Sequence, residues 1–125
     1  MGKVEEGLSV LAEALALIPV TGWRMWEPEV YRRKGELILQ SQVEGLKSKV
    51  EAEAEECFLK AIEIARQQQA KSLELRAVMS LSRLWQQQGK KAEARQLLAE
   101  IYGWFTEGFD TADLKEAKTL LEELV

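Results

Sequence analysis

The chain has 125 residues, of which 46% are hydrophobic and 30% are charged, and this length suits one domain with a packed core. Its 17 basic and 21 acidic residues give a net charge of −4, so it has no general positive field for nucleic acid or anionic lipid. Histidine and asparagine are both absent, which excludes histidine metal ligands and Ser-His or Cys-His nucleophile pairs. The single cysteine, Cys57, excludes an intrachain disulfide, so we expect a reducing, cytoplasmic location.

Apolar residues recur at helical spacing through almost the whole chain, and no segment alternates as a half-buried strand does. We therefore expect an all-α protein of six helices. The first is predicted from Lys3 to Ile18 and ends at Pro19. The second is predicted from Trp26 to Gln40, with Pro28 in its first turn, where the missing N–H would have no helical partner.

The remaining helices follow from turn and capping signals. Residues 41–49 are polar and indicate either a connection or a frayed helix extension. The four later helices are expected at Val50 to the 67–69 glutamine run, Ser72 to Gln88 with Gly89 as the stop, Lys90 to Phe105, and a last helix capped by Asp110 or Thr111.

The helices repeat along the chain. A shift of 47 residues places the first helix on the third and the second on the fourth, so that Gly35 falls on Ser82. A shift of 40 places the third helix on the fifth, so that Ala54 falls on Ala94. Two helix types therefore alternate, which predicts antiparallel hairpins that stack.

The segment around Gly89 carries the clearest motif. Val78, Leu81, Ser82 and Trp85 precede it, and Ala94, Leu98 and Ile101 follow it, with Ser82 and Ala94 separated by 12 positions. This pattern resembles the tetratricopeptide repeat (TPR). The resemblance implies a right-handed α-α superhelix in which residues 1–125 form a single domain and residues 110–125 form a C-terminal capping helix.

A narrower resemblance covers nearly the full length and rests on four strings: YRRKGEL at 31–37, AEECF at 54–58, AKSLELRA at 70–77 and YGWFTEGFDT at 102–111. They are similar to the C-terminal TPR module of large bacterial signalling proteins, which place a nucleotide cyclase or DNA-binding domain first and an AAA-type ATPase second. The resemblance implies that this sequence is a fragment or C-terminal module of a longer protein, with catalysis elsewhere in that protein.

In the TPR family the concave face is lined by residues of the first helix of each hairpin. By register, the candidate partner-binding residues are Glu29, Arg32, Arg33, Glu36, Arg76, Met79, Arg83, Gln86 and Gln87. Arginine predominates among them, so an acidic peptide or a carboxylate terminus is the expected partner, held by forked hydrogen bonds. Alternatively, these arginines pair with Glu29, Glu36 and Glu74 along their own helices.

Two further functions remain open. The first helix has no hairpin partner, so its apolar stripe could pack against a second copy and form a homodimer. That stripe consists of Leu8, Leu11, Leu15 and Ile18. The third hypothesis is a ligand-sensing domain that regulates a linked cyclase or ATPase.

No motif for catalysis, a cofactor or a metal is visible: glutamate neighbours such as Glu122 and Glu123 point to different helix faces, and the glycines are scattered at turns. Cys57 is expected to be a buried structural thiol, and Trp85 and Trp104 are expected in the core. Trp23 and Trp26 are expected either to pack against the core or to anchor a partner protein as exposed aromatic residues. The sequence therefore predicts a non-catalytic protein–protein interaction module that binds neither nucleic acid nor membrane.

Overall fold

The structure is a computed structural model that describes residues 2–21, 24–40, 47–105 and 111–124. The described part is all-helical and contains no strand, which confirms the predicted fold class. Its elements in chain order are α1 (Gly2–Thr21), the 3₁₀ turn η1 (Arg24–Trp26), α2 (Glu27–Gln40), α3 (Lys47–Gln67), α4 (Lys71–Gln87), α5 (Lys91–Tyr102) and α6 (Ala112–Glu123).

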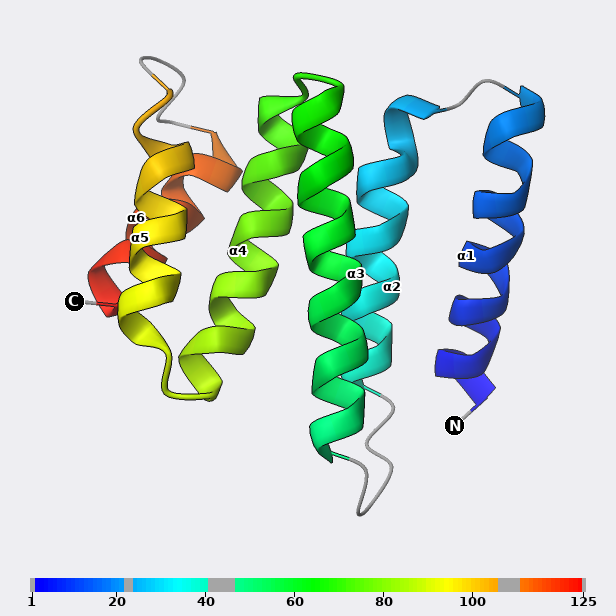
Figure 1. Ribbon diagram of the computed structural model, residues 1–125, viewed down its shortest axis with the longest axis horizontal. Helices are drawn as coiled ribbons and strands as arrows, with labels where there is room; N and C mark the ends of the chain where they lie inside the picture. Colours follow the sequence, from blue (N-terminus) through cyan, green and yellow to red (C-terminus); the bar gives the residue numbers. More distant parts are fainter. Residues whose placement is uncertain (1, 22–23, 41–46, 106–110, 125) are drawn as a thin grey trace.

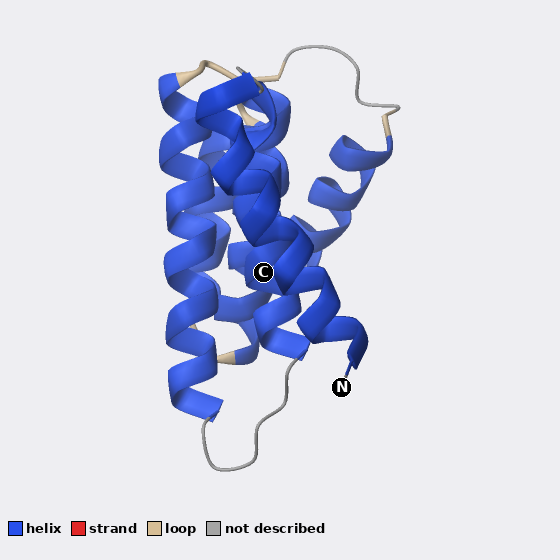
Figure 2. Cartoon of the chain, turned by 90° about the vertical axis from the view of Figure 1, so that its right-hand side faces the viewer, coloured by secondary structure: helices blue, strands red, loops and turns tan. Residues whose placement is uncertain are grey.

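Successive helices run antiparallel and form a stack of hairpins, as Figure 1 shows. The stack has two rows. Helices α2, α4 and α6 form an inner row in which α4 contacts both α2 and α6, while α3 and α5 lie on the other side and each contact α4. In Figure 2, which views the stack from the α1 end, α3 is the long helix at the left, and α6 begins at the upper right. Helix α1 packs against α2 at the end of the stack.

The hydrophobic core runs through the centre of the stack from α3 to α6, and Tyr31, Ile38 and Leu39 of α2 pack against it. Its largest fully buried side chains include Phe58 of α3 and Leu81 of α4. A Cβ atom at Gly35 of α2 would lie only 2.5 Å from Cε1 of Phe58. The buried ring therefore requires glycine where the repeat pattern predicts a small residue.

Three helix boundaries differ from the expectation by more than one residue. Helix α1 continues through Pro19 to Thr21, because a proline near a helix end costs one backbone hydrogen bond and does not forbid the last turn. Helix α3 begins at Lys47 instead of Val50, since its exposed first turn needs no apolar residue. Helix α5 ends at Tyr102, three residues before Phe105, and Gly103 forms its C-cap.

The N-terminus of α6 is capped by Thr111, whose Oγ1 accepts a hydrogen bond from the Leu114 N–H at 3.4 Å. This confirms one of the two expected caps. The other, Asp110, lies outside the described residues.

The turns that join α3 to α4 and α4 to α5 have the same geometry. The Ala70 N–H donates to the Ala65 carbonyl at 2.9 Å, and the Lys90 N–H donates to the Trp85 carbonyl at 2.8 Å. In each turn the preceding residue has a positive φ, 56° at Gln69 and 81° at Gly89. Both are the Schellman type of helix end. The same local structure thus recurs at a spacing of 20 residues, and only the second turn has the glycine that suits it.

We expect Gln69→Gly to raise the free energy of unfolding by about 0.5–1 kcal/mol, because the left-handed region strains a residue with a Cβ atom. Urea unfolding followed by circular dichroism measures this change. Gly89→Ala is the matched control and should lower stability by a similar amount. A Gln69→Gly protein no more stable than the wild type would contradict the left-handed geometry at this turn.

Candidate functional site

The inner face, defined here as the exposed side of α2, α4 and α6, carries a connected cluster of ion pairs. On α2, Arg32 donates from Nε and Nη2 to the two carboxylate oxygens of Glu29, the latter bond at 3.0 Å. Its Nη1 donates to Oε1 of Glu36 at 2.8 Å. The Ser80 hydroxyl of α4 donates to the same Glu36 oxygen at 2.9 Å. The Arg32 guanidinium is thus enclosed by carboxylates from its own helix.

Arg76 of α4 joins the three helices of the inner row. Its Nη1 donates to Oε2 of Glu29 on α2 at 3.0 Å, and its Nε donates to Oδ2 of Asp113 on α6 at 2.9 Å. These partners are 47 and 37 positions away in the sequence. A single guanidinium therefore connects two hairpins, α2–α3 and α4–α5, with the last helix, α6, and it braces the inner row.

The charges of this cluster nearly cancel. Arg32 and Arg76 contribute +2 and the carboxylates of Glu29, Glu36 and Asp113 contribute −3, so the cluster carries −1. The Arg32 side chain is only 13% exposed. Pairing along the helix, the alternative left open by the sequence, is what the structure shows for Arg32. Arg76 pairs across helices instead, and Glu74 binds Arg66 of α3.

The other residues expected on this face differ in their exposure to solvent. Met79 is 3% exposed and belongs to the core, so it offers no binding surface. Gln86 is half-buried, whereas Arg33 and Gln87 are exposed.

Arg83 is the most exposed of the arginines that form ion pairs on the inner face. Its side chain is 46% exposed, and Nη2 lies 3.3 Å from Oε2 of Glu116 on α6. These two residues line a small hollow of about 280 Å³ between α4 and α6, together with Lys115, Thr119, Leu120 and Glu123. The exposed pair is held weakly, because solvent screens it on both sides. Its arginine is therefore available to a competing carboxylate.

Sequence reasoning missed Asp113 and Ser80. Asp113 lies in the first turn of α6, where an acidic residue is explained by the helix dipole alone. Ser80 is 5% exposed and has no partner on its own helix. Only the packing of α4 between α2 and α6 reveals their roles.

The cluster shifts the ionisation of its members. Burial raises the pKa of Glu29, but the hydrogen bonds and charges of Arg32 and then Arg76 outweigh this, and the pKa lies below its ordinary value. Burial lowers the pKa of Arg32, but pairing with Glu29 leaves it above its ordinary value. The hydrogen bond from Arg76 to Asp113 likewise raises the pKa of Arg76. All three groups are therefore charged at neutral pH.

We expect Glu29→Gln to destabilise the fold by about 1–2 kcal/mol at neutral pH, because the charge-assisted bonds of two arginines are lost. A lowered folded-state pKa stabilises the fold above the ordinary value of 4.5, and this contribution is lost as the pH falls below that value. The stability difference between wild type and variant should therefore shrink between pH 6 and pH 3 in urea titrations. A constant difference across that range would contradict the role assigned to Glu29.

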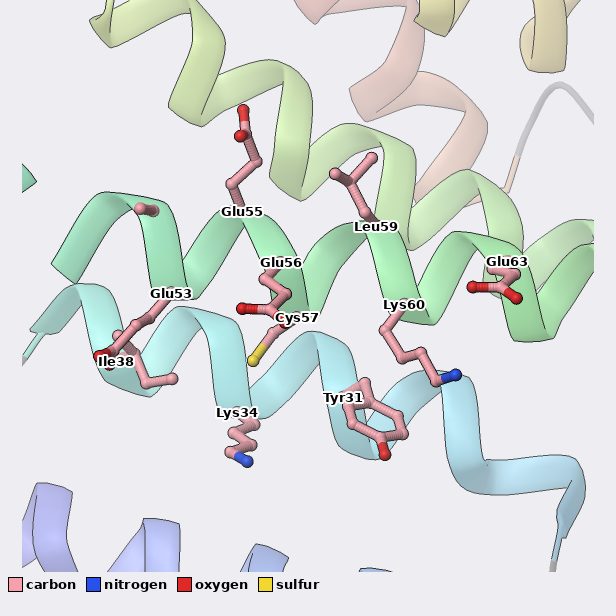
Figure 3. Close-up of a pocket in the computed structure, with 11 residues that line it drawn as sticks. Tyr31, Lys34, Ile38, Glu53, Glu55, Glu56, Cys57, Leu59, Lys60 and Glu63 are labelled. Atoms are coloured by element: carbon pink, nitrogen blue, oxygen red, sulfur yellow. The ribbon is translucent and has the colours of Figure 1, made fainter. Parts of the chain in front are cut away.

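An open groove of about 850 Å³ runs along α2 and α3. Figure 3 shows Tyr31 and Lys34 of α2 near Cys57 and Lys60 of α3, whereas Glu55 and Leu59 project to the other side of α3. Cys57 is half-buried and lines this groove, so the expectation of a buried thiol is wrong. Burial raises the pKa of Cys57, which keeps the thiol protonated and weakly nucleophilic at neutral pH.

The aromatic residues divide into packed and exposed ones. Trp85 is half-buried against the core, and its Nε1 donates to Glu55 of α3. Trp104 is 57% exposed, so its expected place in the core is wrong, although Phe105 packs against the core beside it. Trp26 is also more than half exposed, and Trp23 lies outside the described residues.

The stripe of α1 that was expected to self-associate is described in part. Leu8 and Leu11 are half-buried, and Val10 is 62% exposed. Leu11 and Val10 line an apolar groove of about 500 Å³ with Leu37 of α2, beside Glu6, Gly7 and Arg33. Leu15 and Ile18 belong to α1, but their side chains lie outside the described part.

The described residues contain no group of three acidic or cysteine side chains arranged to hold a metal ion, and no described helix is long and apolar enough to cross a membrane. Comparison of this chain with protein-family models, with curated proteins and with solved structures gave no match.

Proposed function

We propose that this chain is a non-catalytic protein–protein interaction module of the TPR kind, which acts as a regulatory scaffold in a cytoplasmic bacterial signalling protein. The observation that carries the proposal is the connection of α2, α4 and α6 through Arg76. This brace holds α2, α4 and α6 in one arrangement before a partner binds. A preformed face loses less conformational entropy on association than a flexible one.

The Arg83 region is the part of the inner face that a partner can use. Glu116 is 58% exposed, so a carboxylate of a partner protein can replace it at Arg83 with little loss. Arg32 has no such freedom, because Glu29 and Glu36 already fill its guanidinium fork. The proposed site therefore lies between α4 and α6, with Arg83 as its cationic anchor and Gln86 one helical turn further along α4.

The test is capture of partners from cytoplasmic extract by immobilised protein, followed by affinity measurement on each purified partner. Arg83→Glu should weaken a genuine partner about tenfold or more, since a charge-assisted hydrogen bond becomes a like-charge contact. Lys118→Glu, a charge reversal at an exposed site on α6, is the control and should leave affinity unchanged. Equal binding by Arg83→Glu would place the interaction elsewhere, and the absence of any specific partner would count against the scaffold role.

Homodimer formation is the second candidate, and the apolar groove of α1 and α2 favours it. Its test is the solution mass by light scattering across a dilution series. If α1 is a self-interface, the wild type will be dimeric and Val10→Glu monomeric, because a charge in the groove opposes apolar burial. A monomer at every concentration would exclude this function.

A further inference from the structure

One end of the stack exposes large apolar side chains. Met25 is 65% exposed, Trp26 is 53% exposed and Trp104 is 57% exposed. The elements that carry them lie at the same end of the molecule, where η1, the α3–α4 turn and the end of α5 meet the upper edge in Figure 1. Single exposed apolar residues are ordinary, but three such residues at one end of a small domain mark an interaction surface.

Two of these side chains form one wall of a groove. Met25 and Trp26 face Gln68, Ala70 and Leu73 across a hollow of about 550 Å³. The five described residues that line it are uncharged, and four of them are apolar. The groove therefore suits an apolar side chain of a partner, with Trp26 as the large rigid contact.

Two basic residues, Arg66 and Lys71, adjoin the α3–α4 lining of the groove in the sequence and outnumber the one carboxylate that they share. Nε of Arg66 donates to Oε2 of Glu74 at 3.0 Å, and Nζ of Lys71 lies 3.5 Å from the other oxygen. Two cations thus share one carboxylate, and that carboxylate is 5% exposed. The Arg66 side chain is 53% exposed and the Lys71 side chain 32% exposed, so both can be reached from solvent.

Lys71 also connects the groove with the second exposed tryptophan. Its Nζ lies 5.5 Å from the centroid of the Trp104 ring, within the range of a cation–π contact. Trp104 in turn meets Phe105 edge to face, with ring centroids 5.2 Å apart. The ammonium group is therefore positioned between the groove and the aromatic pair. On the opposite wall an acidic residue, Glu27, directly follows Trp26 and begins α2. The two cations therefore lie on the α3–α4 side of the groove.

We propose that this end of the stack is a docking site for an acidic amphipathic segment of a partner protein. Apolar side chains of that segment occupy the groove beside Trp26 and Leu73, and its carboxylates face Arg66 and Lys71. Charge complementarity selects this occupant, because a chain of net charge −4 places two accessible cations around a single buried carboxylate beside its apolar groove. The site is separate from the inner face and does not depend on Arg83.

The test uses two synthetic 16-residue peptides, one with leucine at helical spacing and glutamate elsewhere, and one in which every glutamate is lysine. Fluorescence anisotropy of labelled peptide at 150 mM salt measures the affinity. The acidic peptide should bind at least about tenfold more tightly than the basic one. Trp26→Ala should weaken the acidic peptide about tenfold, and Lys71→Met about threefold, since the first removes the apolar anchor and the second one rim charge.

The controls separate this site from the rest of the surface. Lys91→Met removes the positive charge of the first residue of α5. This residue is the counterpart of Lys71 at the start of α4, and its substitution should leave the affinity for the acidic peptide unchanged. Leu59→Ala tests an exposed apolar residue away from the groove, and Arg83→Glu tests the inner face; neither should matter. Met25→Glu changes a residue that is 65% exposed and serves if Trp26→Ala fails to fold.

Three outcomes would overturn the proposal. The first is equal binding of the acidic and basic peptides. The second is an affinity that Trp26→Ala, Met25→Glu and Lys71→Met all leave unchanged. The third is a dimer in light scattering that Trp26→Ala dissociates, because the groove would then be occupied by a second copy of the chain.

Discussion

Replacing Phe58 with Ala is expected to lower the free energy of unfolding by about 3–5 kcal/mol. Phe58 is fully buried in α3, and its ring fills the space left by the missing side chain of Gly35 on α2. The variant loses the burial of the ring and leaves a cavity between two helices that cannot close, because both also pack on the rest of the core. Urea unfolding measures the loss, and a change below 1 kcal/mol would contradict the tight contact.

Gly35→Ala tests the other side of the same contact. Alanine favours a helix by about 1 kcal/mol over glycine, but a Cβ atom 2.5 Å from a buried ring forces the helices apart at a cost of about 1–3 kcal/mol. We therefore expect a net loss of up to about 2 kcal/mol. In a Phe58→Ala background the same substitution should be stabilising, and this reversal of sign is the double-mutant signature of a direct contact.

Gly7→Ala is the matched control for that experiment. Its new Cβ atom would lie 2.9 Å from Cδ1 of Leu37, the end of a half-buried side chain that can change rotamer. The helix preference then dominates, and stability should rise by up to about 1 kcal/mol. A loss at Gly7 as large as the loss at Gly35 would mean that crowding between the helices is general and not specific to the aromatic ring.

The second large effect is expected at α6. Ala117 is fully buried where α6 packs on α4 and α5, so Ala117→Asp places an unpaired carboxylate in the core and should cost about 3–5 kcal/mol. Among the described elements, α6 packs mainly against α4 and α5. We therefore expect α6 to detach before the rest of the stack unfolds, and hydrogen exchange should show its amides losing protection while those of α3 and α4 keep theirs.

Lys118→Asp is the control for this variant, because the next residue along α6 is exposed. It should change stability by less than about 0.5 kcal/mol. A protein that loses protection in all helices at once after Ala117→Asp would show that α6 is inseparable from the core, and would contradict its role as a separately attached cap.

The sequence predicts best what a regular repeat determines. Gly35, Ser82, Ala54 and Ala94 were expected as the small residues at which helices approach, and all four are buried in the structure. The Ser82 hydroxyl donates to the Ala94 carbonyl at 3.4 Å, which shows how closely the two helices of that hairpin meet. Periodicity identifies such positions because one apolar stripe on each helix must meet the next helix.

The sequence predicts least where partners come from distant helices. The bond between Arg76 and Asp113 depends on the angle at which α6 crosses α4, and no local spacing encodes that angle. The same limit explains Met79, which has the register of a surface residue but is covered in the inner row. Exposure of Trp104 was missed because an aromatic pair near a helix end is explained equally well by packing.

The bonds of Arg76 make binding and ionisation in this protein interdependent. Glu29 on α2 and Asp113 on α6 share its guanidinium. A ligand that drew Asp113 away would leave that guanidinium to Glu29 and lower the pKa of the Glu29 carboxyl further. By thermodynamic reciprocity, protonation of Glu29 would weaken the binding of that ligand to α6. A pH titration of Glu29 followed by carboxyl NMR, with and without a partner, would therefore detect binding at α6 as a change in the pKa of Glu29 on α2, two helices away in the inner row.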